Sequence, residues 1–140
     1  MQLILPTSIT FPRKTKDDKK YMLNLNVYRN LNYIVNNQMK VAFADLLSRN
    51  PAECFVFKDH IAVGLPVDPP YRFTYTLFQE TKRKTDVSNV CCVVDKFCCD
   101  ALVSLGVLPD DNHNIIKEVV YRYGGVDKEN PRVELEIDSI

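Results

Sequence analysis

Hydrophobic residues recur at helical spacing in two long stretches of the chain, which cover about 25–47 and 88–105. In both stretches an apolar side chain returns every three or four positions, the pattern of a helix with one buried face. Asn24 or Asn26 is suited to cap the first helix, and Gly106 is suited to end the second. The pattern therefore predicts two main amphipathic helices.

Shorter stretches have the composition or the alternation of β-strands. The clearest is Tyr71–Phe78, where aromatic and polar residues alternate after the turn Asp68-Pro69-Pro70. The others are Leu3–Leu5, Cys54–Phe57 with Ile61–Leu65, Ile115–Tyr123 and Arg132–Ile137. We expect the last two to form a closing strand pair. Because strands precede and follow the helices, we predict an α+β fold, a single domain over residues 1–140 with two main helices packed on one mixed β-sheet.

Residues 7–20 show no apolar period, contain Pro12 and carry many charges, so we expect a loop there. Its basic residues are Arg13, Lys14, Lys16, Lys19 and Lys20, and a second basic run consists of Lys82, Arg83 and Lys84. The chain as a whole is neutral, with 18 basic and 18 acidic residues. Local basic patches on a neutral protein permit nucleic-acid binding without requiring it.

The composition is that of a folded domain, with 46% hydrophobic residues. No apolar run approaches the ~18 residues that a membrane span needs. The first residues lack the basic region of a signal peptide, so we expect a cytoplasmic protein. Four of the five cysteines form the adjacent pairs 91/92 and 98/99, a spacing that does not fit a zinc or redox motif. We expect buried small hydrophobic residues in a reducing compartment.

Three aspartates flank the second predicted helix: Asp86 precedes it, directly after the basic run, and Asp110-Asp111 follows it. A carboxylate at position 86 can either cap the helix or bind a divalent cation beside phosphate-binding cations. The Asp110-Asp111 pair is typical of a solvated turn, but phosphodiester hydrolysis needs two or three such oxygens around hard cations. The three carboxylates would act together only if the helix folded back across the sheet.

The residues of this region resemble the RusA family of Holliday junction resolvases, which is common in phages and prophages. The matching residues are Lys84-Thr85-Asp86-Val87-Ser88-Asn89, Asp95-Lys96-Phe97, Asp100-Ala101-Leu102, Gly106 and Asp110-Asp111. The family's core pattern is Asp-x-Asp-Asn, then a lysine, then Asp-Ala-Leu and an Asp-Asp pair that leads into a strand. The closing strands also resemble the family, so the resemblance is strong over residues 82–137 and weak before them.

The resemblance implies a homodimer that binds branched DNA and cuts four-way junctions symmetrically, with Mg²⁺ as cofactor and Mn²⁺ as an alternative. It implies no membrane partner. Asp86 and Asp111 would be the catalytic metal ligands with Asp110 beside them, and Lys96 would be the catalytic lysine. Asn89 corresponds to the motif's asparagine and would contact DNA together with both basic segments.

Two departures from the family pattern affect this predicted site. Ser88 stands where the family has its second motif aspartate, and a hydroxyl is a far weaker ligand for a hard cation. Asp95 could supply the missing carboxylate. Four extra residues, about one helical turn, also lie within the motif. Counting from Asp86 therefore places Cys92, rather than Lys96, at the lysine position.

Simpler interpretations remain open for two of these residues. Lys96 could be a solvated helix residue that pairs with Asp100 at i+4. His113 could approach a substrate phosphate or lie in a surface turn.

Three functions follow from these alternatives. The leading one is a Mg²⁺-dependent endonuclease that resolves Holliday junctions. The second is a DNA-binding protein of the same fold that has lost cleavage, because Ser88 removes a ligand. The third is a protein-interaction module in which the acids only cap helices and form turns.

Overall fold

A four-stranded mixed sheet forms the centre of the computed structural model, which describes residues 2–49, 57–58, 61–62 and 68–140. In spatial order its strands are β1 (Gln2–Leu5), β8 (Arg132–Ser139), β6 (Tyr71–Gln79) and β7 (Ile116–Val126). β6 runs parallel to β7 and antiparallel to β8, and β8 runs antiparallel to β1. The predicted α+β class and the mixed main sheet are confirmed, but the sheet is not single, because two separate two-stranded sheets accompany it.

The most clearly predicted strand, β6, lies between the two strands that we expected to pair with each other. β7 and β8 each pair with β6, so the predicted closing pair is wrong. β6 has a continuous buried run at Phe73, Thr74 and Tyr75, and a strand buried in this way belongs in the interior of a sheet. The Asp127 amide donates to the Gln79 carbonyl (2.8 Å) where the chain crosses the end of β6.

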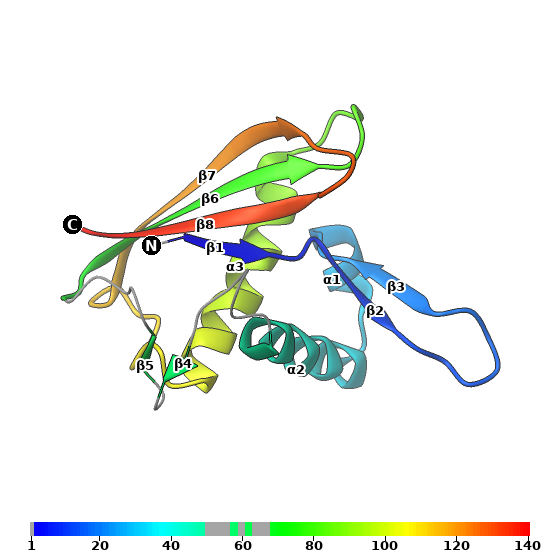
Figure 1. Ribbon diagram of the computed structural model, residues 1–140, viewed down its shortest axis with the longest axis horizontal. Helices are drawn as coiled ribbons and strands as arrows, with labels where there is room; N and C mark the ends of the chain where they lie inside the picture. The colour runs from blue at the N-terminus through cyan, green and yellow to red at the C-terminus, as the bar shows by residue number, and fades with distance from the viewer. Residues whose placement is uncertain (1, 50–56, 59–60, 63–67) are drawn as a thin grey trace.

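All three helices lie on one side of this sheet (Figure 1). They are α1 (Leu25–Asn30), α2 (Tyr33–Arg49) and α3 (Val87–Ser104). α3 connects β6 to β7 and lies against both strands, and α2 packs against α3. Phe43 of α2 stacks on Phe97 of α3 with 6.0 Å between ring centroids. Side chains on one face of the sheet, such as the paired Tyr75 of β6 and Leu135 of β8, are fully buried in the core.

The first predicted helix is in fact two helices, α1 and α2, because the chain turns at Leu31-Asn32. The Asn24 side chain accepts a hydrogen bond from the Val27 amide, which confirms one of the two predicted caps. The Asn32 side chain accepts a hydrogen bond from the Val35 amide in the same way, and the donor–acceptor distance is 2.9 Å in both cases. The apolar period continues through the break, so the hydrophobic pattern alone did not reveal it.

α3 confirms the second predicted helix almost to the residue. Gly106, which follows its last turn, has a φ of 78°, a conformation that favours glycine. Cys91, Cys98 and Cys99 are buried and Cys92 is half-buried, in agreement with the prediction of buried small side chains. The remaining cysteine, at position 54, lies outside the described residues.

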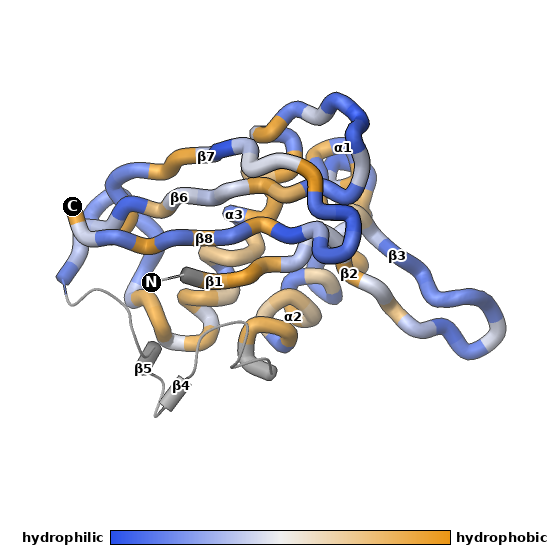
Figure 2. Tube along the Cα trace, turned by 45° about the horizontal axis from the view of Figure 1, so that its top comes forward, coloured by the Kyte–Doolittle hydropathy of each residue, from blue (hydrophilic) through white to orange (hydrophobic). Residues whose placement is uncertain are grey.

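Residues 8–22 form a β-hairpin and not the predicted loop. β2 (Ser8–Phe11) and β3 (Lys19–Met22) pair antiparallel, and this hairpin, here called the arm, projects from the body of the protein (Figure 1). Ile9 anchors the base of the arm in the core, whereas residues 12–20 are exposed. The charges of the exposed end (blue in Figure 2) concealed the strand alternation in the sequence.

Two further predicted strands fall partly on described residues. The structure describes β4 (Phe57–Lys58) and β5 (Ile61–Ala62), which pair antiparallel. Residues Cys54–Val56 and Val63–Leu65 of those predictions lie outside the described residues. Among the helices that the structure describes, none is both long and apolar enough to cross a membrane.

Candidate functional site

Asp86 occupies the N-cap position of α3, but its side chain makes no capping hydrogen bond. The residue is exposed. Its carboxylate lies where the first amide groups of α3 and the helix dipole favour a negative charge. Because the side chain is not used to cap the helix, it is available to bind a cation or a polar ligand.

The surroundings of Asp86 are basic. It lines a cleft of about 530 Å³, here called the Asp86 cleft, together with Lys20 of the arm and Arg83 and Lys84 of the β6–α3 connection. Glu80 is a second carboxylate in the lining, which no sequence motif had indicated. Lys20 and Arg83, which are 63 positions apart in the sequence, thus line the same cleft as Asp86.

Hydrogen bonds fix the basic connection that precedes Asp86. The Gln79 side-chain amide donates to the Arg83 carbonyl at 2.8 Å, and the Thr85 hydroxyl donates to the same oxygen at 3.3 Å. Lys82 is exposed on the same connection. The other predicted DNA-binding residues of the arm, Arg13, Lys14, Lys16 and Lys19, lie exposed at its end.

Asn89 also lines the Asp86 cleft, but it has a structural contact that the sequence did not predict. Its Oδ1 accepts a hydrogen bond from the Leu25 amide at 3.2 Å. Leu25 is the first residue of α1, and α1 directly follows the arm. Asn89 therefore links α3 to the segment that carries Lys20. Ser88, next to it, is exposed.

Asp110 and Asp111 lie in an exposed turn beyond the other end of α3. Asp110 uses both carboxylate oxygens within this turn, accepting from the Asp111 amide and from the Asn112 side chain, each at 2.8 Å. These hydrogen bonds lower the pKa of Asp110. Asp111 is exposed beside it. His113 is exposed in the same turn.

One chain does not bring the two acidic positions together. Asp86 and Asp111 are separated by the length of α3, whose 18 residues span ~27 Å at a rise of about 1.5 Å per residue. β7 starts beside the beginning of β6, so α3 lies along the sheet and does not fold its ends together. Within the described ranges, no group of three His, Cys, Asp or Glu side chains could hold a metal ion.

Asp95, predicted as a replacement ligand, joins α3 to the sheet. Its Oδ1 accepts a hydrogen bond from the Tyr75 hydroxyl (2.6 Å) and its Oδ2 accepts one from the Tyr121 hydroxyl (2.8 Å). The Cys99 thiol lies 3.2 Å from Oδ1. Burial, and then the charge of Asp95, raise the pKa of Tyr121 well above its usual value. These contacts account for Asp95 without a metal.

Lys96 lies exposed on α3, ten residues after Asp86. This spacing puts it ~15 Å along the helix axis, so it does not line the Asp86 cleft. Its suggested partner, Asp100, forms an ion pair with Lys40 of α2 instead (3.5 Å). Cys92, the other residue at the motif's lysine position, is half-buried.

A comparison of the sequence with protein-family models gives no match, and a comparison with curated protein sequences gives none either. The resemblance to the RusA family therefore rests on the motif residues of segment 82–137 alone.

Proposed function

We propose that this protein is a homodimeric, Mg²⁺-dependent endonuclease of the RusA type that cuts branched DNA, with the four-way junction as its substrate. The observation that carries the proposal is that the Asp86 carboxylate, which makes no capping hydrogen bond, lines a cleft together with Lys20, Arg83 and Lys84. Lysine and arginine bind phosphate oxygens, and an acid among them is the residue type that brings a divalent cation to the phosphodiester. A solvated cap alone would not need this basic cleft.

A second chain would complete the acidic site. Asp86 and Asp111 lie at opposite ends of α3, and within the described residues of one chain too few ligands surround either of them. In a two-fold dimer with antiparallel α3 helices, Asp86 of one copy lies near Asp111 of the other. Each dimer then has two equivalent sites, one for each of the two strands that a symmetric resolution cuts.

In such a site Asp86 and Asp111 would hold Mg²⁺, which prefers oxygen ligands and supplies water activation and stabilisation of the leaving oxygen. Lys20, Arg83 and Lys84 would bind the phosphates beside the bond that is cut. Contacts of this kind select the shape of a junction more than its base sequence.

Mixing two inactive variants tests the shared site. Asp86→Asn and Asp111→Asn are each expected to bind a four-way junction and to leave it uncut. After subunit exchange, each heterodimer has one site with both substitutions and one site with none. We therefore expect strand nicking to return in the mixture, measured with an end-labelled junction in Mg²⁺.

The outcomes separate the parts of the proposal. A mixture that stays inactive after exchange has been verified by native mass spectrometry contradicts the shared site. Homodimers of either variant that cut like the unmodified protein contradict a metal-dependent nuclease at these residues.

A second function, junction binding without cleavage, is favoured by the exposed Ser88 at the position of the family's second motif aspartate. Junction binding with no nicking at any Mg²⁺ or Mn²⁺ concentration would support it. Under the nuclease proposal, Ser88→Asp adds a carboxylate two residues after Asp86 and should raise cleavage or leave it unchanged. A clear loss of metal affinity in this variant would contradict the motif alignment.

A further inference from the structure

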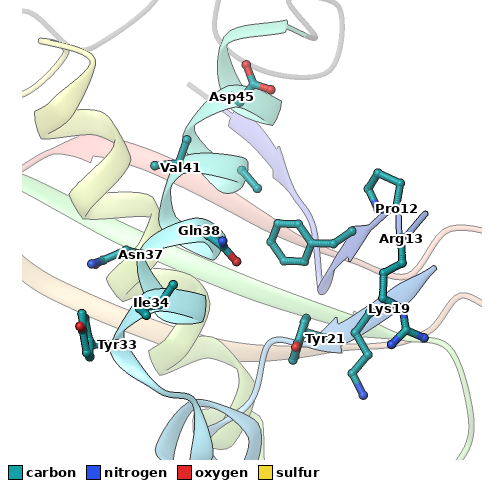
Figure 3. Close-up of a pocket in the computed structure, with 12 residues that line it drawn as sticks. Pro12, Arg13, Lys19, Tyr21, Tyr33, Ile34, Asn37, Gln38, Val41 and Asp45 are labelled. Atoms are coloured by element: carbon teal, nitrogen blue, oxygen red, sulfur yellow. The ribbon is translucent and has the colours of Figure 1, made fainter. Parts of the chain in front are cut away.

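The arm and α2 line a second, open hollow, which is separate from the Asp86 cleft. It has a volume of about 940 Å³ and is here called the arm groove (Figure 3). Three large apolar side chains of α2 line it although they are strongly exposed: Tyr33 (76%), Ile34 (54%) and Val41 (70%). A single α-helix of a folded domain normally turns such residues inward, so this face is suited to bind something.

The opposite wall of the arm groove is aromatic and basic. The Phe11 and Tyr21 rings pack edge to face with 5.9 Å between centroids. The Lys19 ammonium lies 5.4 Å from the centre of the Tyr21 ring, and the Arg13 Nε donates to the Asp17 carbonyl at 2.7 Å. These contacts orient the two cations at the rim beside the rings, as Figure 3 shows for Arg13, Lys19 and Tyr21.

The strand alternation of β3 connects the arm groove with the Asp86 cleft. Lys19 and Tyr21 line the groove, whereas the intervening Lys20 and Met22 line the cleft. Successive side chains of a strand point to opposite faces, so the arm separates two cavities and presents a lysine to each. A chain of phosphates that passes over the arm would meet cations on both sides.

The arm groove is lined by two cations and one carboxylate, that of Asp45, and so suits an occupant that combines flat apolar surfaces with negative charge. Bases stack on aromatic side chains, and the phosphates between them bind lysine and arginine, which is the usual composition of single-strand binding sites. Asn37 and Gln38 of α2 also line the groove and offer amide donors and acceptors to base edges. A paired duplex hides its base faces and cannot use the rings.

We propose that the arm groove binds unpaired nucleotides, which stack on Phe11, Tyr21 and Tyr33 while Arg13 and Lys19 hold their phosphates. This deepens the proposed function and rests on it, because the branch point of a junction or fork is where a DNA substrate offers unstacked bases. The Asp86 cleft would then act on the adjoining backbone on the other side of the arm.

The test measures the affinity of the full-length protein for a fluorescein-labelled oligothymidylate and for a duplex, by fluorescence anisotropy in EDTA. Tyr33→Ala removes a ring that is three-quarters exposed, so the fold should tolerate it. Because stacking on one ring changes affinity by about fivefold or more, we expect at least that loss for the oligothymidylate and no change for the duplex. Tyr123→Ala is the matched control, since Tyr123 is a half-exposed tyrosine on β7 that lines neither cavity.

A second readout is direct. An oligonucleotide with 2-aminopurine should lose fluorescence on binding to the unmodified protein, because the base stacks, and lose less with Phe11→Leu or Tyr33→Ala. Equal oligothymidylate affinity of Tyr33→Ala, Tyr123→Ala and the unmodified protein would overturn the proposal. An Ile34→Arg variant that is monomeric in sedimentation velocity but binds the oligonucleotide normally would also overturn the proposal. The groove would then be a contact between subunits and not a nucleotide-binding site.

Failure of the nuclease proposal gives a different result. The binding assay contains no divalent cation and scores no cleavage, so the loss of oligothymidylate affinity caused by Tyr33→Ala should also appear when it is introduced into the Asp111→Asn protein. A protein that never cuts DNA but shows the Tyr33-dependent affinity would retain the nucleotide site and lose only the nuclease.

Discussion

The two ends of α3 carry acidic residues in very different surroundings. At the first end, Asp86 makes no capping hydrogen bond and lines a cleft together with Lys20, Arg83 and Lys84. At the other end, Asp110 is occupied by hydrogen bonds of its own turn, and Asp111 is exposed beside it. Under the proposed function, phosphates would bind at the first end, whereas the second end would supply a carboxylate.

Under the proposed function, this difference would leave a single chain with an incomplete site. Cations without enough carboxylates can hold DNA but not metal, and a carboxylate on a bare turn can hold neither tightly. An antiparallel arrangement of two copies would place each kind of end against the other. Asp86, Asp110 and Asp111 would then have different roles, although the sequence motif groups them as one set of acids.

The largest expected effect separates the two neighbouring acids. Asp111→Asn should reduce junction cleavage by about a thousandfold or more, since it removes a metal ligand, while junction affinity stays the same. Asp110→Asn should retain most cleavage, because the Asp110 oxygens accept hydrogen bonds within the turn. Single-turnover cleavage with saturating protein measures both. Equal losses in the two variants would contradict the distinction.

A smaller effect is expected at the basic end. Lys20→Ala should weaken junction binding and reduce the slope of log K against log salt by about 0.9, the share of one phosphate contact. Arg122→Ala is the control, because Arg122 is exposed on β7 and lines neither cavity. Anisotropy titrations at several salt concentrations give the slope. An unchanged slope in Lys20→Ala would contradict a phosphate contact of Lys20 in the Asp86 cleft.

Asp95 attaches α3 to the sheet through the hydroxyls of Tyr75 and Tyr121. Tyr121→Phe removes the hydroxyl that donates to Asp95 Oδ2 and should lower the free energy of unfolding by about 1–2 kcal/mol. Tyr123→Phe should leave it unchanged, because Tyr123 is half exposed. Urea unfolding followed by circular dichroism measures both variants. Equal stability of the two would contradict a tether at Asp95.

The buried Cys91 thiol and the Tyr121 hydroxyl beside Asp95 predict a loss of stability in alkali. Burial raises the pKa of Cys91 from 9.0 to about 12, and burial and Asp95 raise the pKa of Tyr121 above 10.0. The folded state keeps these protons where the unfolded state releases them, so the free energy of unfolding is unaffected below pH 9 and falls as the pH rises above it. Urea unfolding between pH 7 and pH 11 tests this. Cys91→Ala and Tyr121→Phe should each flatten the fall.

The smallest effect belongs to the turn at the second end. Hydrogen bonds lower the pKa of Asp110 below 3.8, so its ionised form stabilises the turn above that pH and the contribution is lost as the pH falls through the lowered pKa. Asp110→Ala should therefore unfold at a slightly lower temperature than the unmodified protein at neutral pH. The two melting temperatures should converge in acid, as calorimetry would show.

Local patterns predicted the elements whose signal is contained in their own residues. α3 and β6 match the expected stretches because helical period and strand alternation are set by burial of one face. The failures have equally physical causes. The break at Leu31-Asn32 interrupts the backbone without interrupting the apolar period, and the charges of residues 12–20 outweighed the alternation of the arm. The pairing of β7 with β6 could not be predicted in this way, because a local pattern does not show which strand lies next to another in the sheet.

The sequence by itself determined the α+β class, α3 with its stop at Gly106, and the acids at both ends of that helix, because each depends on residues close together in the chain. Only the tertiary structure decided that Lys20 lines one cleft with Arg83, Lys84 and Asp86, and that Asp95 is held by two tyrosines. It also decided that Asp86 and Asp111 lie beyond opposite ends of α3, a helix of ~27 Å. Convergence and separation in space depend on how distant segments pack, and a rigid helix of 18 residues keeps its ends apart however well its motif matches.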